Sequence, residues 1–102
     1  MIREVAILKL KADVIGDALR LLGEHAAFKR TRPGCRAAAV NPMAKAPAMP
    51  YLDANTIMLY AEYDDLQCLA QCSQAVQEHF ELHALPFQDF LVGAPVYGVF
   101  EA

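Results

Sequence analysis

Two segments of the sequence have the composition of β-strands and carry apolar residues on both faces, and this pattern most constrains the fold. The first runs from Ile2 to Leu10 and the second from Thr56 to Tyr63. Side chains alternate between the two faces of a strand, so both faces of these segments need apolar cover. A chain of 102 residues with 56% apolar content has apolar surface left over when it folds alone. The pattern therefore predicts central strands that are covered in part by a partner subunit or a ligand.

The segment between these two strands is expected to hold a helix and a short strand. Asp13 is a candidate N-cap for a helix from about Val14 to Arg30. Pro33-Gly34 ends that helix. The small residues from Cys35 to Val40 then indicate a short strand.

The second half of the chain repeats this order. Asp64 or Asp65 is expected to cap a helix that continues to about His83. Phe87 to Leu91 could form one more turn, and Val96 to Glu101 a last strand. Residues 1–102 are therefore predicted to form one α+β domain, a ferredoxin-like βαββαβ fold with an antiparallel sheet.

Both helices of this fold would cover the same face of the sheet. The other face would be bare in a monomer, although Leu8, Leu10, Met58 and Tyr60 need cover on whichever face they occupy. Packing two sheets face to face provides that cover. The sequence therefore predicts a homodimer.

The segment from Asn41 to Asn55 contains three prolines and is expected to be a long loop. Loops of this length are uncommon inside compact domains and are often functional. We expect it to cover a cavity mouth or to reach across the dimer, with Tyr51 or Met49 as its apolar anchor.

Several classes of protein are disfavoured by composition. The net charge is −3, and the longest basic run, Lys29 to Arg32, falls at an expected helix end, which argues against nucleic-acid binding. The sequence has no apolar run of the roughly 20 residues that a membrane span needs. Its start lacks the layout of a signal peptide. Cys35, Cys68 and Cys72 form an odd set without a CxxC pair, so reduced thiols in a cytoplasmic protein are expected.

Three stretches resemble a known superfamily, the dimeric α/β barrels. Met1 to Lys11 (MIREVAILKLK) is similar to the start of stress-responsive barrel proteins. Arg32 to Cys35 (RPGC) resembles the turn after the first helix of antibiotic biosynthesis monooxygenase domains, and Tyr60 to Asp65 (YAEYDD) resembles the end of their third strand. The resemblance implies two ferredoxin-like subunits, each with a cavity between sheet and helices. Cofactor-free oxygenases, cyclases, isomerases, haem-degrading enzymes and proteins without known activity share this fold.

The sequence departs from two patterns of the superfamily. Glu4 stands where many stress-responsive barrels and related cyclases have a histidine on the first strand, which argues against cyclase chemistry. Haem-degrading members use a tryptophan, and this chain has none.

Two groups on the central strands are candidates for chemistry. Glu4 shares a strand face with apolar residues, where a charged carboxylate is costly to bury, and this suits a general base or acid. The alternative is a carboxylate in water or paired with Arg36. Met58, Tyr60 and Glu62 share one face of the third strand and could orient a phenolic or enolic substrate; alternatively, Tyr60 is a core residue.

The end of the second helix supplies further candidates. His83 falls near the apolar face centred on Phe80 and could face a ligand. His79 lies one turn earlier, and the two histidines could bind a metal, although no third ligand can be placed. We predict that Glu4, Tyr60, Glu62 and His83 meet in one pocket between the sheet and the second helix.

The leading hypothesis is a cofactor-independent monooxygenase that acts on a small aromatic or polyketide-like molecule. Glu4, Tyr60, Glu62 and His83 would be catalytic, with Glu4 or His83 as base, and Met58, Tyr51 and Phe80 would bind substrate. No metal or other cofactor is expected. A non-catalytic barrel that binds an apolar metabolite is the alternative, and a metal-binding module the third possibility.

Overall fold

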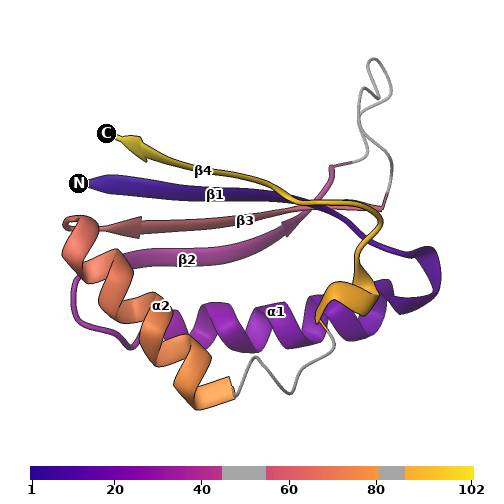
Figure 1. The fold of residues 1–102 in the computed structure, drawn as a ribbon, viewed down its shortest axis with the longest axis horizontal. Helices are drawn as coiled ribbons and strands as arrows, with labels where there is room; N and C mark the ends of the chain where they lie inside the picture. Colours follow the sequence, from indigo (N-terminus) through magenta and orange to yellow (C-terminus); the bar gives the residue numbers. More distant parts are fainter. Residues whose placement is uncertain (45–54, 81–86) are drawn as a thin grey trace.

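The computed structural model describes residues 1–44, 55–80 and 87–102 and has the predicted α+β architecture (Figure 1). Four antiparallel strands form one sheet in the order β2-β3-β1-β4. The strands are β1 (Ile2–Lys9), β2 (Cys35–Pro42), β3 (Thr56–Tyr63) and β4 (Val96–Glu101). The helices α1 (Ile15–Lys29) and α2 (Leu66–Phe80) lie on the same side of the sheet. The ferredoxin-like prediction is therefore confirmed, with β1 and β3 at the centre.

The start of the first helix differs from the prediction. A short 3-10 helix, η1 (Ala12–Val14), precedes α1, and the N-cap of α1 is Val14, which makes no side-chain cap hydrogen bond. Asp13 lies inside η1, so its predicted role as N-cap is wrong. The backbone begins the turn itself, because the N–H of Val14 donates to the carbonyl of Lys11 at 3.2 Å. In the described ranges, neither long helix has the length and apolar content to cross a membrane.

The turn from α1 to β2 and the start of α2 pack against each other. Gly34 has a φ of 77°, and a Cβ at this position would collide with Sγ of Cys68 in α2. Only glycine avoids both the strain and the collision. Asp65 caps α2, because its Oδ1 accepts a hydrogen bond of 2.8 Å from the N–H of Cys68. Of the two predicted caps Asp65 is thus confirmed, while Asp64 pairs with Arg36.

Some predicted boundaries shift and others fall outside the described residues. β2 continues through Pro42, two residues into the predicted loop. The turn expected after Pro86 is the 3-10 helix η3 (Phe87–Phe90). Met49 and Tyr51 of the loop lie outside the described residues, and so does His83.

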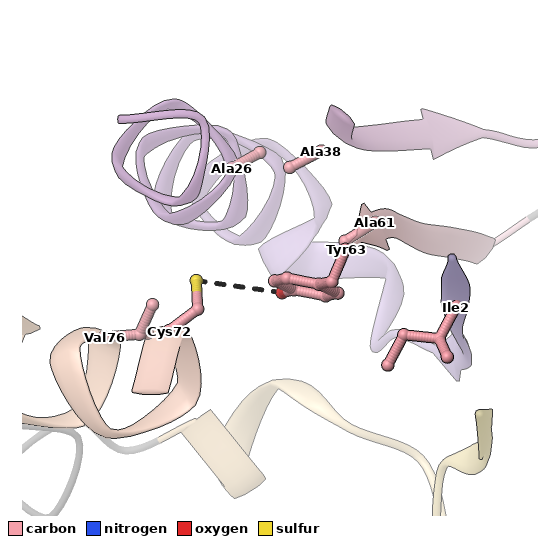
Figure 2. Close-up of a cluster of buried hydrophobic side chains, with 7 residues drawn as sticks. All are labelled: Ile2, Ala26, Ala38, Ala61, Tyr63, Cys72 and Val76. Atoms are coloured by element: carbon pink, nitrogen blue, oxygen red, sulfur yellow. Dashed lines mark hydrogen bonds between the residues drawn. The ribbon is translucent and has the colours of Figure 1, made fainter. Parts of the chain in front are cut away.

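The side of the sheet that the helices cover, here called the helix face, holds the core. Its residues on the two central strands follow the alternation of the sequence: Ile2, Glu4, Ala6 and Leu8 on β1, and Ile57, Leu59, Ala61 and Tyr63 on β3. Figure 2 shows one of the two core clusters, in which Tyr63 projects from β3 toward Cys72 and Val76 of α2. The core thus lies between the helices and the strands β1 and β3.

The opposite side, the open face, carries apolar residues without helices to cover them. Its residues on the central strands include Arg3, Val5 and Ile7 of β1 and Met58, Tyr60 and Glu62 of β3. On the edge strand β4, Val96 is 69% exposed and Phe100 is 57% exposed. A chain that exposes large apolar side chains on one sheet face has the surface expected of an interface.

Candidate active site

A buried carboxylate with three hydrogen-bond donors is the most unusual polar group on the helix face. Glu4 of β1 is only 9% exposed. Its Oε1 lies 3.2 Å from Nζ of Lys29 and accepts a 3.2 Å hydrogen bond from the hydroxyl of Tyr63. Its Oε2 accepts a 2.7 Å hydrogen bond from the hydroxyl of Tyr97. We call Glu4, Lys29, Tyr63 and Tyr97 the Glu4 cluster.

Four elements position the Glu4 cluster. β1 supplies Glu4 near its start, and the last turn of α1 supplies Lys29. Tyr63 comes from the end of β3 and Tyr97 from the edge strand β4. The carboxylate is satisfied because a cation and two hydroxyls replace the water it loses on burial.

Both tyrosines of the cluster act as donors at neutral pH. Burial raises the pKa of Tyr63, and the negative charge of Glu4 raises it further. Burial also raises the pKa of Tyr97, and its hydrogen bond to Glu4 adds to the effect. The hydroxyl of Tyr63 also lies 3.8 Å from Sγ of Cys72, as Figure 2 shows. The two phenols therefore stay protonated and hold the carboxylate in place.

His25 lies one helical turn before Lys29 on the same face of α1. It is buried, and its ring lies 4.2 Å from the ring of Phe80 in α2. Burial lowers the pKa of His25, the charge of Lys29 lowers it further, and Glu24 opposes these effects. Among the described residues, Nε2 of His25 has no hydrogen-bond partner. His25 is thus a neutral buried imidazole with one unused polar atom at the core.

The lowered pKa of His25 predicts a pH dependence of stability. Below its ordinary pKa of 6.5, the unfolded chain binds a proton at this histidine that the folded chain binds less readily. The free energy of unfolding should therefore fall as the pH drops below about 6.5. Above that value the contribution of His25 should no longer change with pH. Urea unfolding between pH 8 and pH 5 measures this. His25→Phe should flatten the fall, while His79→Gln, which keeps His25, should retain it; equal slopes in the two variants would contradict the assignment.

A second polar group lies on the open face. The hydroxyl of Tyr60 donates a 2.5 Å hydrogen bond to Oε1 of Glu62, and this bond raises the pKa of Tyr60. Nε of Arg3 lies 3.6 Å from the same oxygen. Met58 shares this face. The predicted association of Tyr60, Glu62 and Met58 on one strand face is therefore present.

The structure separates this group from Glu4, and the predicted common pocket is wrong on this point. In the register of β1 and β3, Glu4 lies opposite Ala61, whereas Glu62 lies opposite Arg3. Directly opposed residues share a face, so Glu4 and Glu62 point to opposite sides of the sheet. Phe80 is on the same side as Glu4, where it packs on His25.

The other predicted site residues and the metal hypothesis receive little support. His83 and Tyr51 lie outside the described residues. The ring of His79 stacks on Phe28 at 4.2 Å. Within residues 1–44, 55–80 and 87–102, no three His, Cys, Asp or Glu side chains are placed to hold a metal ion. Burial raises the pKa of the Cys35 thiol, which makes it a poorer nucleophile.

Three members of the Glu4 cluster were missed by sequence reasoning. Lys29 was interpreted only as a helix-end cation, and Tyr63 and Tyr97 were not considered. A signal for Tyr63 was present: with Ile57, Leu59 and Ala61 it forms the apolar set of β3, which belongs on the core side with Glu4. Nothing local marks Tyr97, because it reaches Glu4 across 93 positions of sequence.

The chain is similar in structure to known oxygenases. A crystal structure of an antibiotic biosynthesis monooxygenase aligns over 100% of this chain and 98% of its own, with a TM-score of 0.78 and 20% identity. A variant of SnoaB, a cofactor-independent oxygenase from Streptomyces nogalater, aligns over 99% and 91%, with a TM-score of 0.74 and 16% identity. A conserved protein from Methanosarcina mazei aligns over 97% and 89%, with a TM-score of 0.76 and 18% identity.

No family profile and no curated protein sequence matches the chain. At these identities the structural likeness establishes the fold. The chain therefore has the fold of the antibiotic biosynthesis monooxygenase structures.

Proposed function

We propose that this protein is a cofactor-independent monooxygenase that binds a small phenolic or enolic aromatic molecule beside Glu4. The observation that carries the proposal is the buried Glu4 carboxylate. It accepts hydrogen bonds from two tyrosine hydroxyls and from the ammonium of Lys29. The fold shared with a cofactor-independent oxygenase supports the same reaction class.

The contact of Tyr97 with Glu4 supports the proposal that a phenolic substrate binds there. Its hydroxyl donates to Oε2 of Glu4, yet the residue belongs to the edge strand β4 and is 56% exposed. The hydroxyl of a phenolic substrate has the same chemistry as that of Tyr97. It could replace Tyr97 as the hydrogen-bond donor to Oε2 of Glu4. Val99, which is next on the same face of β4, is also exposed and supplies apolar contact for a ring.

The proposed reaction needs only a base, a positive charge and dioxygen. Glu4 takes the acidic proton of the substrate, and the ammonium of Lys29 stabilises the enolate oxygen that forms. The enolate carbon then reacts with dioxygen, the oxidant. In sum, a CH2 group and O2 give a C=O group and H2O, so the substrate supplies all the electrons.

Oxygen uptake tests the proposal. Purified protein is incubated with a panel of anthrones and hydroquinones in an oxygen electrode, and products are identified by mass spectrometry. Uptake coupled to one ketone oxygen gained per dioxygen is the expected result. Thermal stabilisation by the same compounds without uptake would instead favour the alternative, a barrel that binds apolar molecules without catalysis.

We also propose that the open faces of two subunits pack together. Support comes from the exposed Val96 and Phe100 of β4. The half-buried residues of the same face add to it: Val5, Ile7, Met58 and Tyr60. In such a pair, the group formed by Tyr60, Glu62 and Arg3 would face the partner copy. Two sheets packed in this way give the barrel of the superfamily.

If the open faces form the dimer interface, a charge introduced on this face should prevent dimer formation. Wild-type protein should sediment as a dimer at micromolar concentration, with an interface above roughly 1,200 Å² of total buried area. Ile7→Glu places a carboxylate on this face of a central strand and should give a folded monomer, because an unpaired charge there is costly to bury. Ala70→Glu, on the exposed side of α2, is the matched control and should remain dimeric. A wild-type monomer would refute the assembly.

A further inference from the structure

A small cavity lies between α1 and the sheet and shares one residue with the Glu4 cluster. Its volume is about 30 Å³. Its apolar wall includes side chains of α1 and of the strands β2 and β3: Leu22, Ala26, Ala38, Val40 and Leu59. His25, Lys29, Ala39 and Tyr60 complete the lining.

The size of the cavity excludes the aromatic substrate and fits a diatomic molecule. One water-sized sphere needs about 10–15 Å³ of such space, so the cavity has room for about two heavy atoms. Cavities walled by aliphatic side chains take up apolar guests such as xenon rather than water. A water molecule would need two to four polar partners here. The ammonium of Lys29, which lines the cavity, is already engaged by Glu4.

His25 lines the cavity and carries a ring nitrogen that makes no hydrogen bond within the described part of the chain. The residue is more than nine-tenths buried, and within the described ranges its Nε2 has no hydrogen-bond partner. A buried polar atom left without a partner is costly unless it has a function. A guest that becomes an anion during a reaction would use this atom, because the neutral imidazole can donate from Nε2 in one of its two tautomers.

We propose that this cavity is the dioxygen site of the protein. The proposal rests on the oxygenase function proposed above, and it places the oxidant beside Lys29, whose ammonium also pairs with Glu4. Dioxygen itself is apolar and suits the aliphatic wall. Once reduced it carries negative charge, which the Lys29 ammonium and an N–H of His25 would stabilise.

The electrons and atoms balance without a further reactant. One electron passes from the substrate enolate to dioxygen, giving superoxide and a substrate radical, and these combine to form the C–O bond. The resulting peroxide takes up the proton that the base removed. The same carbon then loses its second hydrogen as a proton while the O–O bond breaks, which leaves a ketone and releases water.

Gas binding tests the site without any turnover. Crystals of the full chain pressurised with xenon should show a xenon peak between Leu22, Val40 and Leu59. In solution, dissolved dioxygen should enhance the relaxation of the methyl groups of these three residues more than that of Val76, which lines no part of this cavity. An ordered water bonded to Nε2 of His25, with no xenon and no methyl relaxation, would overturn the proposal.

A pair of valine variants links the cavity to the reaction. Val40→Ile adds one methyl group to the cavity wall and should remove the xenon peak. With an active substrate, it should also raise KM for dioxygen by at least about fivefold and leave the Kd of that substrate unchanged. Val76→Ile adds one methyl group at a buried valine elsewhere in the core. It should leave both the xenon peak and KM for dioxygen unchanged. If Val40→Ile excludes xenon but leaves KM for dioxygen unchanged, the cavity is not the oxygen site.

The two proposals fail in different ways. If no compound of the panel supports oxygen uptake, the oxygenase function is lost, and with it the role of this cavity in catalysis. Xenon binding and methyl relaxation would still decide whether the cavity takes up a diatomic gas. Oxygen uptake without gas binding in the cavity would support the oxygenase function and contradict the proposal that this cavity is the dioxygen site.

Discussion

Glu4→Gln is expected to lower kcat for oxygen uptake by at least about 100-fold, because a general base contributes 10²–10⁴ to the rate. Glutamine has nearly the same shape, and its amide oxygen can still accept from Tyr63 or Tyr97, so the fold and the dimer should persist. The loss should fall mainly on kcat, and the substrate Kd should rise as well, because the amide replaces the carboxylate that would accept the substrate hydroxyl. Stopped-flow or electrode measurements of uptake, with circular dichroism and sedimentation as checks, give these quantities.

Glu62→Gln is the matched comparison on the opposite face of the sheet. Glu62 lies on β3, only one register position away from the residue opposite Glu4, but its side chain points to the open face. If the reaction occurs on the helix face, this variant should keep kcat within about threefold of wild type, since Glu62 makes no contact with the Glu4 cluster and glutamine can still accept from Tyr60. Unchanged turnover in Glu4→Gln would remove Glu4 from the mechanism, and loss in Glu62→Gln alone would move the reaction to the open face.

The fold could be predicted because each element carries its own local signal. The alternation in β1 and β3 reports which residues share a face, and the structure keeps both sets as the sequence indicates. Asp65 was found because a carboxylate directly before an apolar helix is a local capping pattern. Asp13 fits the same pattern and does not cap, because η1 begins the turn by backbone hydrogen bonds.

The site could be predicted only in part because a site depends on register. Alternation shows which residues of one strand go together, but not which face of the neighbouring strand they join. A shift by one position moves Glu62 from the side of Glu4 to the side of Arg3, and this is what the structure shows. The contact of Lys29 with Glu4 depends on where the last turn of α1 crosses the sheet. No local sequence pattern predicts how close Lys29 comes to Glu4.

The ion pair between Glu4 and Lys29 should make a large contribution to stability. The side chains of the two residues are 11% and 20% exposed, so water screens their charges much less than it screens a surface pair. Removing one partner of a buried pair leaves an uncompensated charge and costs about 3–5 kcal/mol. Partial exposure of Lys29 lowers this cost, and for Lys29→Met we expect a loss of about 2 kcal/mol. That loss corresponds to a fall in Tm of roughly 8–16 °C for a domain of this size.

A double-mutant cycle separates the ion pair from simple loss of packing. Met keeps the apolar stem of Lys29, so Lys29→Met removes mainly the charge. If the cost arises from the unpaired carboxylate of Glu4, the double variant Glu4→Gln/Lys29→Met should be at least about 1 kcal/mol more stable than the sum of the single changes predicts. Arg20→Met breaks the ion pair of Arg20 with Asp17, whose side chains are 74% and 72% exposed, and should cost less than about 0.5 kcal/mol. Additive losses in the cycle, measured by urea unfolding at pH 7, would show that the burial of Glu4 does not depend on Lys29. The two tyrosine hydroxyls would then be sufficient to hold the carboxylate at the centre of the proposed site.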